Sequence, residues 1–161
     1  MKRYLAICIC ALMIHCQAQK PALILTSATQ QSWGGGAAGS GSGTNYTIVY
    51  SAVKAGQYRF AYLCTNGGVL TINTKPKRDS LVTLNAGESV TLTAQQYYPG
   101  DIDKRSGRDT ATANTLKRNA LIAGALPSVY NGKDVVIYYC NGRKQYFAIP
   151  VIKRLSPLNY P

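Results

Sequence analysis

The alternation of apolar and polar positions predicts short β-strands along most of the chain. Runs of four to nine residues rich in Val, Ile, Thr and Tyr are separated by turns that contain Asn and Gly, at 65–68, 85–87 and 141–142. Period-two alternation bounded by such turns is typical of strands and hairpins. The predicted strands are residues 22–27, 45–53, 58–63, 69–72, 81–84, 89–93, 134–140 and 145–152.

Eight or nine strands at this spacing predict an all-β fold, an antiparallel β-sandwich formed by residues 19–161 as one domain. One long polar loop interrupts the pattern between residues 97 and 133. Residues 112–126 fit either a short helix or a further strand, and we expect a loop that runs into a strand. Long loops on rigid scaffolds often carry function, so residues 97–118 belong to the expected contact surface.

A glycine-rich stretch follows the single tryptophan, with six glycines between residues 32 and 47. A phosphate-binding loop needs its glycines between a strand and a helix, followed by Gly-Lys-Ser/Thr, and this stretch lies between two predicted strands. A flexible linker needs a domain on each side, and too few residues precede the glycine-rich stretch to form a domain. We therefore expect a connection inside the domain, with close backbone approach and Trp33 packed at its start.

The N-terminus has the layout of a secretory signal peptide over residues 1–18. Lys2 and Arg3 precede an apolar run at 5–14 that is too short to span a bilayer, and Cys16-Gln-Ala18 forms a cleavage site. A lipoprotein that begins at Cys16 is an alternative, although Ile14 and His15 are bulkier than such sites prefer. The predicted location is the bacterial periplasm or the exterior.

Cleavage after residue 18 removes the only histidine, His15, and leaves two of the five cysteines, Cys64 and Cys140. Two cysteines in an exported domain most often pair, so we predict a disulfide between them. The alternative is a catalytic thiol, which would need a histidine that the mature chain lacks.

The run from Asp134 to Cys140 resembles the Asp-x-Gly/Ala-x-Tyr-x-Cys signature of immunoglobulin domains. The resemblance covers about seven residues, and Val136 stands where the family has a small residue. It implies an immunoglobulin-like sandwich in which Tyr138 makes the corner hydrogen bond and Cys140 pairs with Cys64. It implies no particular ligand.

Acidic residues offer little for catalysis or metal binding. Asp101, Asp103 and Asp109 fit a carboxylate pair or a calcium loop only poorly, because cations stand between them. With no histidine in the mature chain, zinc is also disfavoured. We expect no enzyme activity, no metal and no cofactor.

Basic residues dominate, with 18 Lys and Arg against 6 Asp and Glu and a formal net charge of +12. Such a surface attracts polyanions, although scattered charge also serves solubility alone. The expected partners are an anionic glycan, lipopolysaccharide or an acidic protein, and export disfavours intracellular nucleic acid. The predicted ligand-binding residues are Trp33, Lys75, Lys77, Arg78, Tyr97, Tyr98, Lys104, Arg105 and Arg108.

These observations predict an exported, non-catalytic binding or accessory module that contacts anionic ligands. The alternative is a structural envelope subunit that joins an assembly through its β-edges. A hydrolase is the third possibility.

Overall fold

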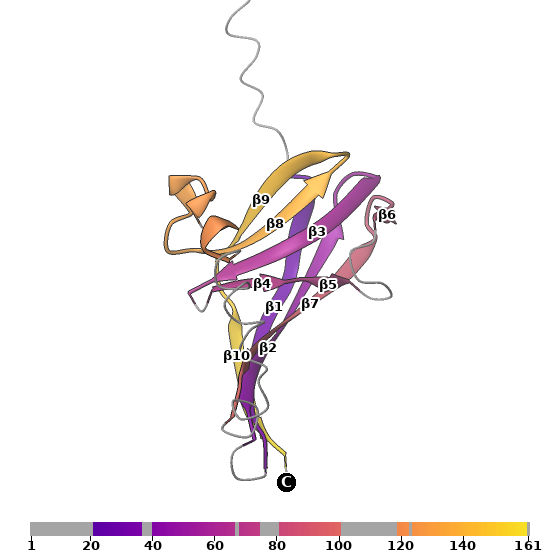
Figure 1. The fold of residues 1–161 in the computed structure, drawn as a ribbon. Helices are drawn as coiled ribbons and strands as arrows, with labels where there is room; N and C mark the ends of the chain where they lie inside the picture. Colours follow the sequence, from indigo (N-terminus) through magenta and orange to yellow (C-terminus); the bar gives the residue numbers. More distant parts are fainter. Residues whose placement is uncertain are drawn as a thin grey trace, which may run out of the picture.

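The computed structural model describes residues 21–36, 40–66, 68–74, 81–100, 119–122 and 124–160, and in them two β-sheets face each other (Figure 1). One sheet has the order β10-β1-β2-β7-β5, and the other has the order β4-β3-β8-β9, with β6 also paired to β3. The strands are β1 (Leu23–Gly34), β2 (Ser42–Ala52), β3 (Gly56–Thr65), β4 (Gly68–Thr71), β5 (Asn73–Thr74), β6 (Val82–Leu84), β7 (Ser89–Tyr98), β8 (Asp134–Cys140), β9 (Arg143–Ile149) and β10 (Lys153–Asn159). The prediction of a mostly-β, sandwich-like domain is confirmed.

Two features of the larger sheet differ from the sequence-based expectation. The strands β1 and β7 run to Gly34 and Tyr98, well beyond residues 27 and 93. The strand β10 was not predicted, and it pairs in parallel with β1, from Thr29 opposite Lys153 to Gly34 opposite Asn159. The prediction of a purely antiparallel fold was therefore wrong. After β9 the chain crosses to the other sheet, where β10 runs parallel to β1.

The main hydrophobic core fills the space between the sheets. It includes Tyr50, Tyr58 and Phe60, whose rings stack at centroid distances near 6.4 Å, and Phe147 meets Tyr50 edge-on at 4.9 Å. Each fully buried side chain of this size contributes roughly 1.5–3 kcal/mol through the water it excludes. The core therefore fixes how the two sheets face each other.

A second cluster covers the outer face of the smaller sheet, around Val135 and Ile137. Ile122, Leu126 and Tyr130 pack against it from a segment that is helical at 119–122 and forms the 3₁₀ turn η1 (Ser128–Tyr130). These three residues recur every four positions, which is a helical period. The expected strand in this region was therefore wrong, and the helical alternative was right for residues 119–122.

The predicted disulfide does not form, and both cysteines are free. Cys64 lies opposite Val135 and Cys140 lies opposite Tyr58, at the two ends of the β3–β8 pair. At about 3.3 Å per residue the cysteines are separated by roughly 15–20 Å, whereas a disulfide needs Cα atoms within about 7 Å. Cys64 also packs in the outer cluster while Cys140 packs against the core, so they face opposite sides of the sheet.

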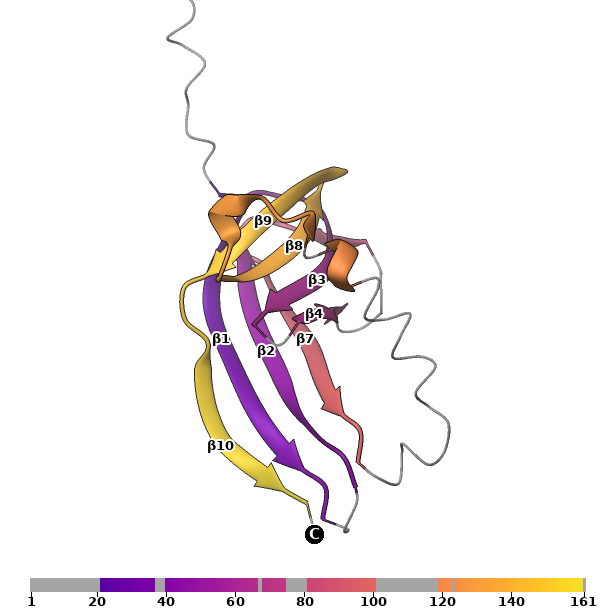
Figure 2. The same cartoon turned by 60° about the vertical axis from the view of Figure 1, so that its left-hand side comes forward.

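The larger sheet continues past the end of the smaller one as a single layer (Figure 2). We call this part the extension; it comprises residues 31–34, 42–45, 95–98 and β10, beyond the buried core residues Tyr46 and Ala94. The glycine-rich stretch closes the β1–β2 hairpin at its tip, where the Gly35 N–H donates to the Gly41 carbonyl oxygen at 3.0 Å. The expectation of a connection inside the domain is confirmed. The predicted signal peptide at 1–18 lies outside the described residues.

Candidate functional site

The extension carries every predicted ligand-binding residue that the structure describes, namely Trp33, Tyr97 and Tyr98. Adjacent residues of a strand point to opposite faces, so Tyr97 and Tyr98 belong to two different surfaces. Tyr97 shares the outer face with Trp33, and Tyr98 lines the inner face toward the smaller sheet. The remaining predicted residues, Lys75, Lys77, Arg78, Lys104, Arg105 and Arg108, lie outside the described part of the chain.

On the outer face, Trp33 and Tyr97 stack across an intervening strand. Trp33 on β1 lies opposite Gly43 on β2, and Gly43 lies opposite Tyr97 on β7. Because Gly43 has no side chain, the two rings lean over it and meet, with centroids 5.9 Å apart and planes inclined by 18°. Tyr160 approaches Trp33 edge-on at 6.3 Å. We call Trp33, Tyr97 and Tyr160 the aromatic platform.

The platform explains two of the glycines. A Cβ atom on Gly43 would overlap the carbonyl oxygen of Gln96 and lie 2.8 Å from Nε1 of Trp33. A Cβ on Gly41 would lie 2.5 Å from the hydroxyl oxygen of Tyr97. These distances are shorter than van der Waals contact, so both rings lie on bare backbone. The predicted close approach of the backbone at Trp33 is confirmed.

A row of amides lies beside the platform on the same face. Gln31 lies opposite Asn45, and Asn45 lies opposite Gln95, one strand repeat away from the aromatic row. We call these three residues the amide row. Amide groups both donate and accept hydrogen bonds, and the Gln31 Nε2 donates to the Ser156 carbonyl oxygen at 2.9 Å. The outer face therefore combines flat rings with uncharged hydrogen-bonding groups.

Charge is absent from the strands that build this face. No Asp, Glu, Lys or Arg occurs in β1, β2 or β7, although the whole chain is strongly basic. Tyr97 and Tyr160 are 48% and 51% exposed, so ring surface remains open to a ligand. Lys153, opposite Thr29 on the edge strand β10, brings a cation to the border of the same face. Contacts on the platform would therefore depend on stacking and hydrogen bonds more than on charge.

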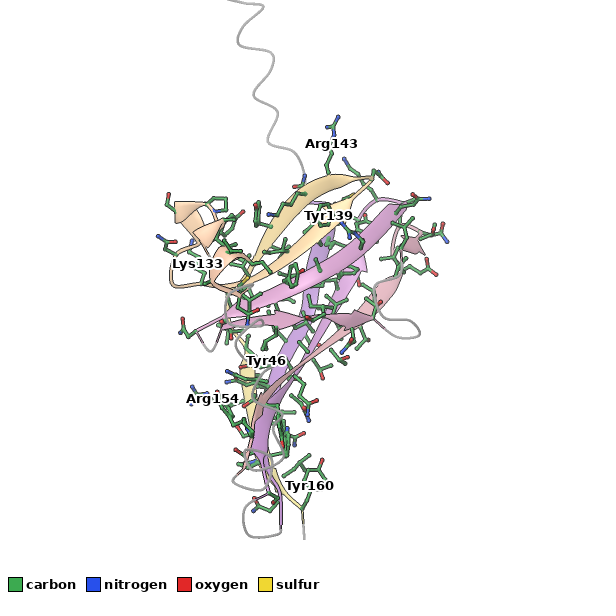
Figure 3. All side chains as sticks on the ribbon, viewed as in Figure 1. Tyr46, Lys133, Tyr139, Arg143, Arg154 and Tyr160 are labelled. Atoms are coloured by element: carbon green, nitrogen blue, oxygen red, sulfur yellow. The ribbon has the colours of Figure 1, made fainter. Side chains whose placement is uncertain are left out.

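The inner face forms a polar cleft of about 680 Å³ where the extension leaves the two-layer part. Tyr46 and Arg154 lie there, and Tyr160 lies near the tip of the extension (Figure 3). The pKa of Asp134 is raised because burial disfavours its charged form, and a hydrogen bond from the Asn66 backbone partly offsets this. Burial likewise raises the pKa of Tyr46. The cleft joins one acid, one base and several neutral polar groups.

Sequence reasoning missed the amide row, Tyr160, Asp134 and Arg154 as site residues. The amide row could have been found from the pairs Gln30-Gln31 and Gln95-Gln96, if each strand had been extended through them. Arg154 and Tyr160 depend on β10, which gives no alternating pattern.

Within the described residues, no three His, Cys, Asp or Glu side chains gather closely enough to hold a metal ion. The helical residues described here include no segment with the length and apolar character needed to cross a bilayer. Neither a protein-family model, nor a curated protein, nor a solved structure matches this chain.

Proposed function

We propose that this protein is an exported, non-catalytic binding module that holds a glycan chain on the outer face of the extension. The observation that carries the proposal is the stacked pair of Trp33 and Tyr97 beside the amide row. A pyranose ring has one face of C–H groups and a rim of hydroxyl groups. Flat aromatic rings match the C–H face, and amides match the hydroxyl rim.

Charge supplies the second element of the proposal, a preference for glycans with acidic groups. Lys153 borders the amide side of the platform, and the surrounding surface of a strongly basic protein raises the local concentration of anions. The electrostatic attraction weakens as the salt concentration rises, whereas stacking on the rings of the uncharged strands persists. An anionic glycan of the cell envelope fits both terms, and the periplasm or the exterior is the proposed location.

An immunoglobulin-like relationship is also part of the proposal. The orders β1-β2-β7-β5 and β3-β8-β9 correspond to the A-B-E-D and C-F-G sheets of that family, which supports it. Tyr138 and Cys140 lie on β8, which would be strand F in this relationship. In the family the bridging cysteine lies in the opposite sheet, whereas Cys64 lies on β3, next to β8 in the same sheet.

The test measures retardation of the protein in native gels that contain soluble polysaccharides, one neutral β-glucan and one polyuronate. Trp33→Ala and Tyr97→Ala should each weaken binding by about ten- to a hundredfold, since one stacked ring is worth roughly 1–3 kcal/mol. Tyr98→Ala is the matched control, because Tyr98 is the adjacent residue, is similarly exposed and faces the cleft. Added salt should weaken binding of the polyuronate alone.

Loss of binding in Tyr98→Ala, with both platform variants unaffected, would move the site to the inner cleft. Absence of retardation by neutral and acidic polysaccharides, and by pelleted cell-wall sacculi, would refute the glycan function.

A structural envelope role through β-edges is the second proposal, and β9 favours it. Among the described strands β9 ends its sheet, and its seven residues contain no proline. The edge strand β10 contains Pro157, which cannot donate to an added strand. Association of the pure protein that survives high salt and is blocked by Gln145→Pro, but not by Tyr97→Ala, would support this role over glycan binding.

A further inference from the structure

The end of the sandwich opposite the extension opens into a cavity of about 590 Å³. The strand β1 begins here, and Arg143 projects from this end, far from Arg154 (Figure 3). The cavity belongs to neither face of the extension. Its lining includes Ala22, Lys54, Tyr138, Cys140, Arg143 and Phe147.

The floor of the cavity is apolar and continues into the main core. Ala22, Cys140 and Phe147 are partly buried and pack directly against the core cluster, while Tyr138 belongs to that cluster. The ring of Phe147 also meets Tyr50 edge-on. Apolar side chains therefore line the bottom, where they would exclude water from a bound molecule.

Hydrogen bonds between side chains and the backbone hold the walls in place. The hydroxyl of Tyr58 lies 2.8 Å from the carbonyl oxygen of Lys54 and 3.3 Å from that of Ala22, so it ties the β2–β3 turn to the start of β1. Asn141 and Gly142 have φ of 49° and 78°, as a two-residue hairpin turn requires. The Asn141 Oδ1 accepts from the Gln57 N–H at 3.0 Å. The cavity is thus preformed by elements fixed to one another.

The rim is cationic. Lys54 and Arg143 are both exposed at the mouth, and the residues that line this cavity include no Asp or Glu. Two cations without a lining carboxylate attract an anion, and an apolar floor beneath them attracts a hydrocarbon or aromatic body. A volume of this size is ordinary for a small-molecule site.

We propose that this cavity binds a small amphiphilic anion, such as a medium-chain fatty acid or an aromatic carboxylate. Its carboxylate would lie at Lys54 and Arg143, and its apolar part would lie on Phe147 and Cys140. A highly charged polymer fits less well, because it would leave the apolar floor unused. A neutral hydrocarbon fits less well, because it would leave both cations without a partner.

Cys140 provides a direct reporter, because its thiol lines the cavity and is partly exposed while Cys64 is only 5% exposed. The experiment measures the rate at which iodoacetamide alkylates Cys140 in the full chain, with the modified cysteine identified by peptide mass spectrometry. Decanoate should slow this rate about tenfold at saturation. Decanol lacks the charge and acetate lacks the chain, so neither should protect at the same concentration.

The double variant Lys54→Gln/Arg143→Gln should raise the decanoate concentration needed for half-protection by about a hundredfold, since it removes two charge-assisted contacts that are each worth roughly a tenfold change in affinity. Arg59→Gln/Lys133→Gln removes the same charge outside the cavity and should leave that concentration unchanged.

Equal protection by decanol, or equal protection in both double variants, would show that the cavity does not select an anion. Absence of protection by decanoate would overturn the proposal altogether. Protection by vesicles of an anionic phospholipid, with none by decanoate, would also overturn it, because the cavity would then recognise a membrane surface and not a free amphiphile.

Discussion

The strands β1, β2 and β7 each have a two-layer half and a half in the extension, and the chemistry of their faces reverses between them. In the two-layer half the inner face is apolar, as at Ile48 and Leu92, and the outer face carries mainly Thr and Ser, with Ile24 and Val49 among them. In the extension the inner face is polar, and the outer face carries Trp33 and Tyr97. In β2 and β7 the alternation continues without a register shift, so the change reflects what covers each face.

This difference supports the proposed position of the binding site on the outer face of the extension. The smaller sheet covers the inner face of one half, which explains its apolar residues. No described element covers the outer face of the extension, yet that face carries the exposed rings. Aromatic surface that serves no core in the described structure is the strongest sign of a binding role in this molecule.

The largest expected effect on the free energy of unfolding comes from a substitution in the core of the two-layer half. Leu92→Ala should lower the free energy of unfolding by about 2–5 kcal/mol, because it leaves a cavity at a fully buried position. Tyr98→Ala, on the same face of the same strand but in the extension, should cost less than about 1 kcal/mol because Tyr98 is 51% exposed. Urea unfolding measures both, and equal losses would contradict the division into two halves.

A smaller effect is expected at Gly43. Gly43→Ala should destabilise the protein by about 1–3 kcal/mol and disrupt the Trp33–Tyr97 stack, because the added methyl group has no room. Gly34→Ala is the control, since nothing lies within 4 Å of its Cβ position. Near-ultraviolet circular dichroism follows the stack. An unchanged spectrum in Gly43→Ala would mean that the rings do not depend on the bare backbone.

Two tyrosines of the core sharpen the comparison further. The hydroxyl of Tyr50 is buried and has no hydrogen-bond partner among the described residues, so Tyr50→Phe should be neutral or stabilise by up to about 1 kcal/mol. The hydroxyl of Tyr58 lies within hydrogen-bond distance of two carbonyl oxygens, so Tyr58→Phe should cost about 1–2 kcal/mol. Thermal unfolding measures both. A loss in Tyr50→Phe would indicate a partner for its hydroxyl.

The smallest effect concerns pH and the covered outer face of the other sheet. Burial raises the pKa of Cys64 from 9.0 to about 11, so the folded state holds its proton more tightly than the unfolded state. This difference in proton binding stabilises the folded state fully below pH 9, and the stabilisation is lost as pH rises toward 11. Burial also raises the pKa of Tyr138 to about 12, which extends the loss above pH 10. Cys64→Ala should flatten the decline between pH 9 and 11, as unfolding midpoints would show, and an unchanged slope would contradict this origin.

The sequence predicted the two-layer half well because alternation there has strong contrast. Residues 45–53 alternate between core and outside, and this predicted strand corresponds closely to β2. Residues 134–140 form a short apolar run between turns, which is buried on both faces and corresponds to β8. In the extension neighbouring residues are alike, as in Gln95-Gln96 and Tyr97-Tyr98, so the period disappears although the strand continues. The alternation therefore did not predict the ends of β1 and β7 or the amide row, which could be found only by extending each strand through its Gln-Gln pair.

Tertiary pairing also set limits on prediction. The count of two cysteines gave no information on register, and register alone places Cys64 and Cys140 at opposite ends of β3 and β8. The sequence predicts two of the three platform residues, Trp33 and Tyr97, as contact residues. Their stacking over Gly43 depends on which strands are neighbours in the sheet.

The parallel pair of β1 and β10 has a consequence for the order of folding. Gln31 contacts Ser156 across 125 residues of sequence. One edge of β1 can therefore pair only after β10 has been synthesised and has folded against it. Contacts between residues so far apart in the sequence form slowly. Until they form, the unpaired edge of β1 can pair with strands of other chains. During folding the extension would be the last region to acquire its native edge. Its assembly therefore reports that the whole domain has emerged and folded.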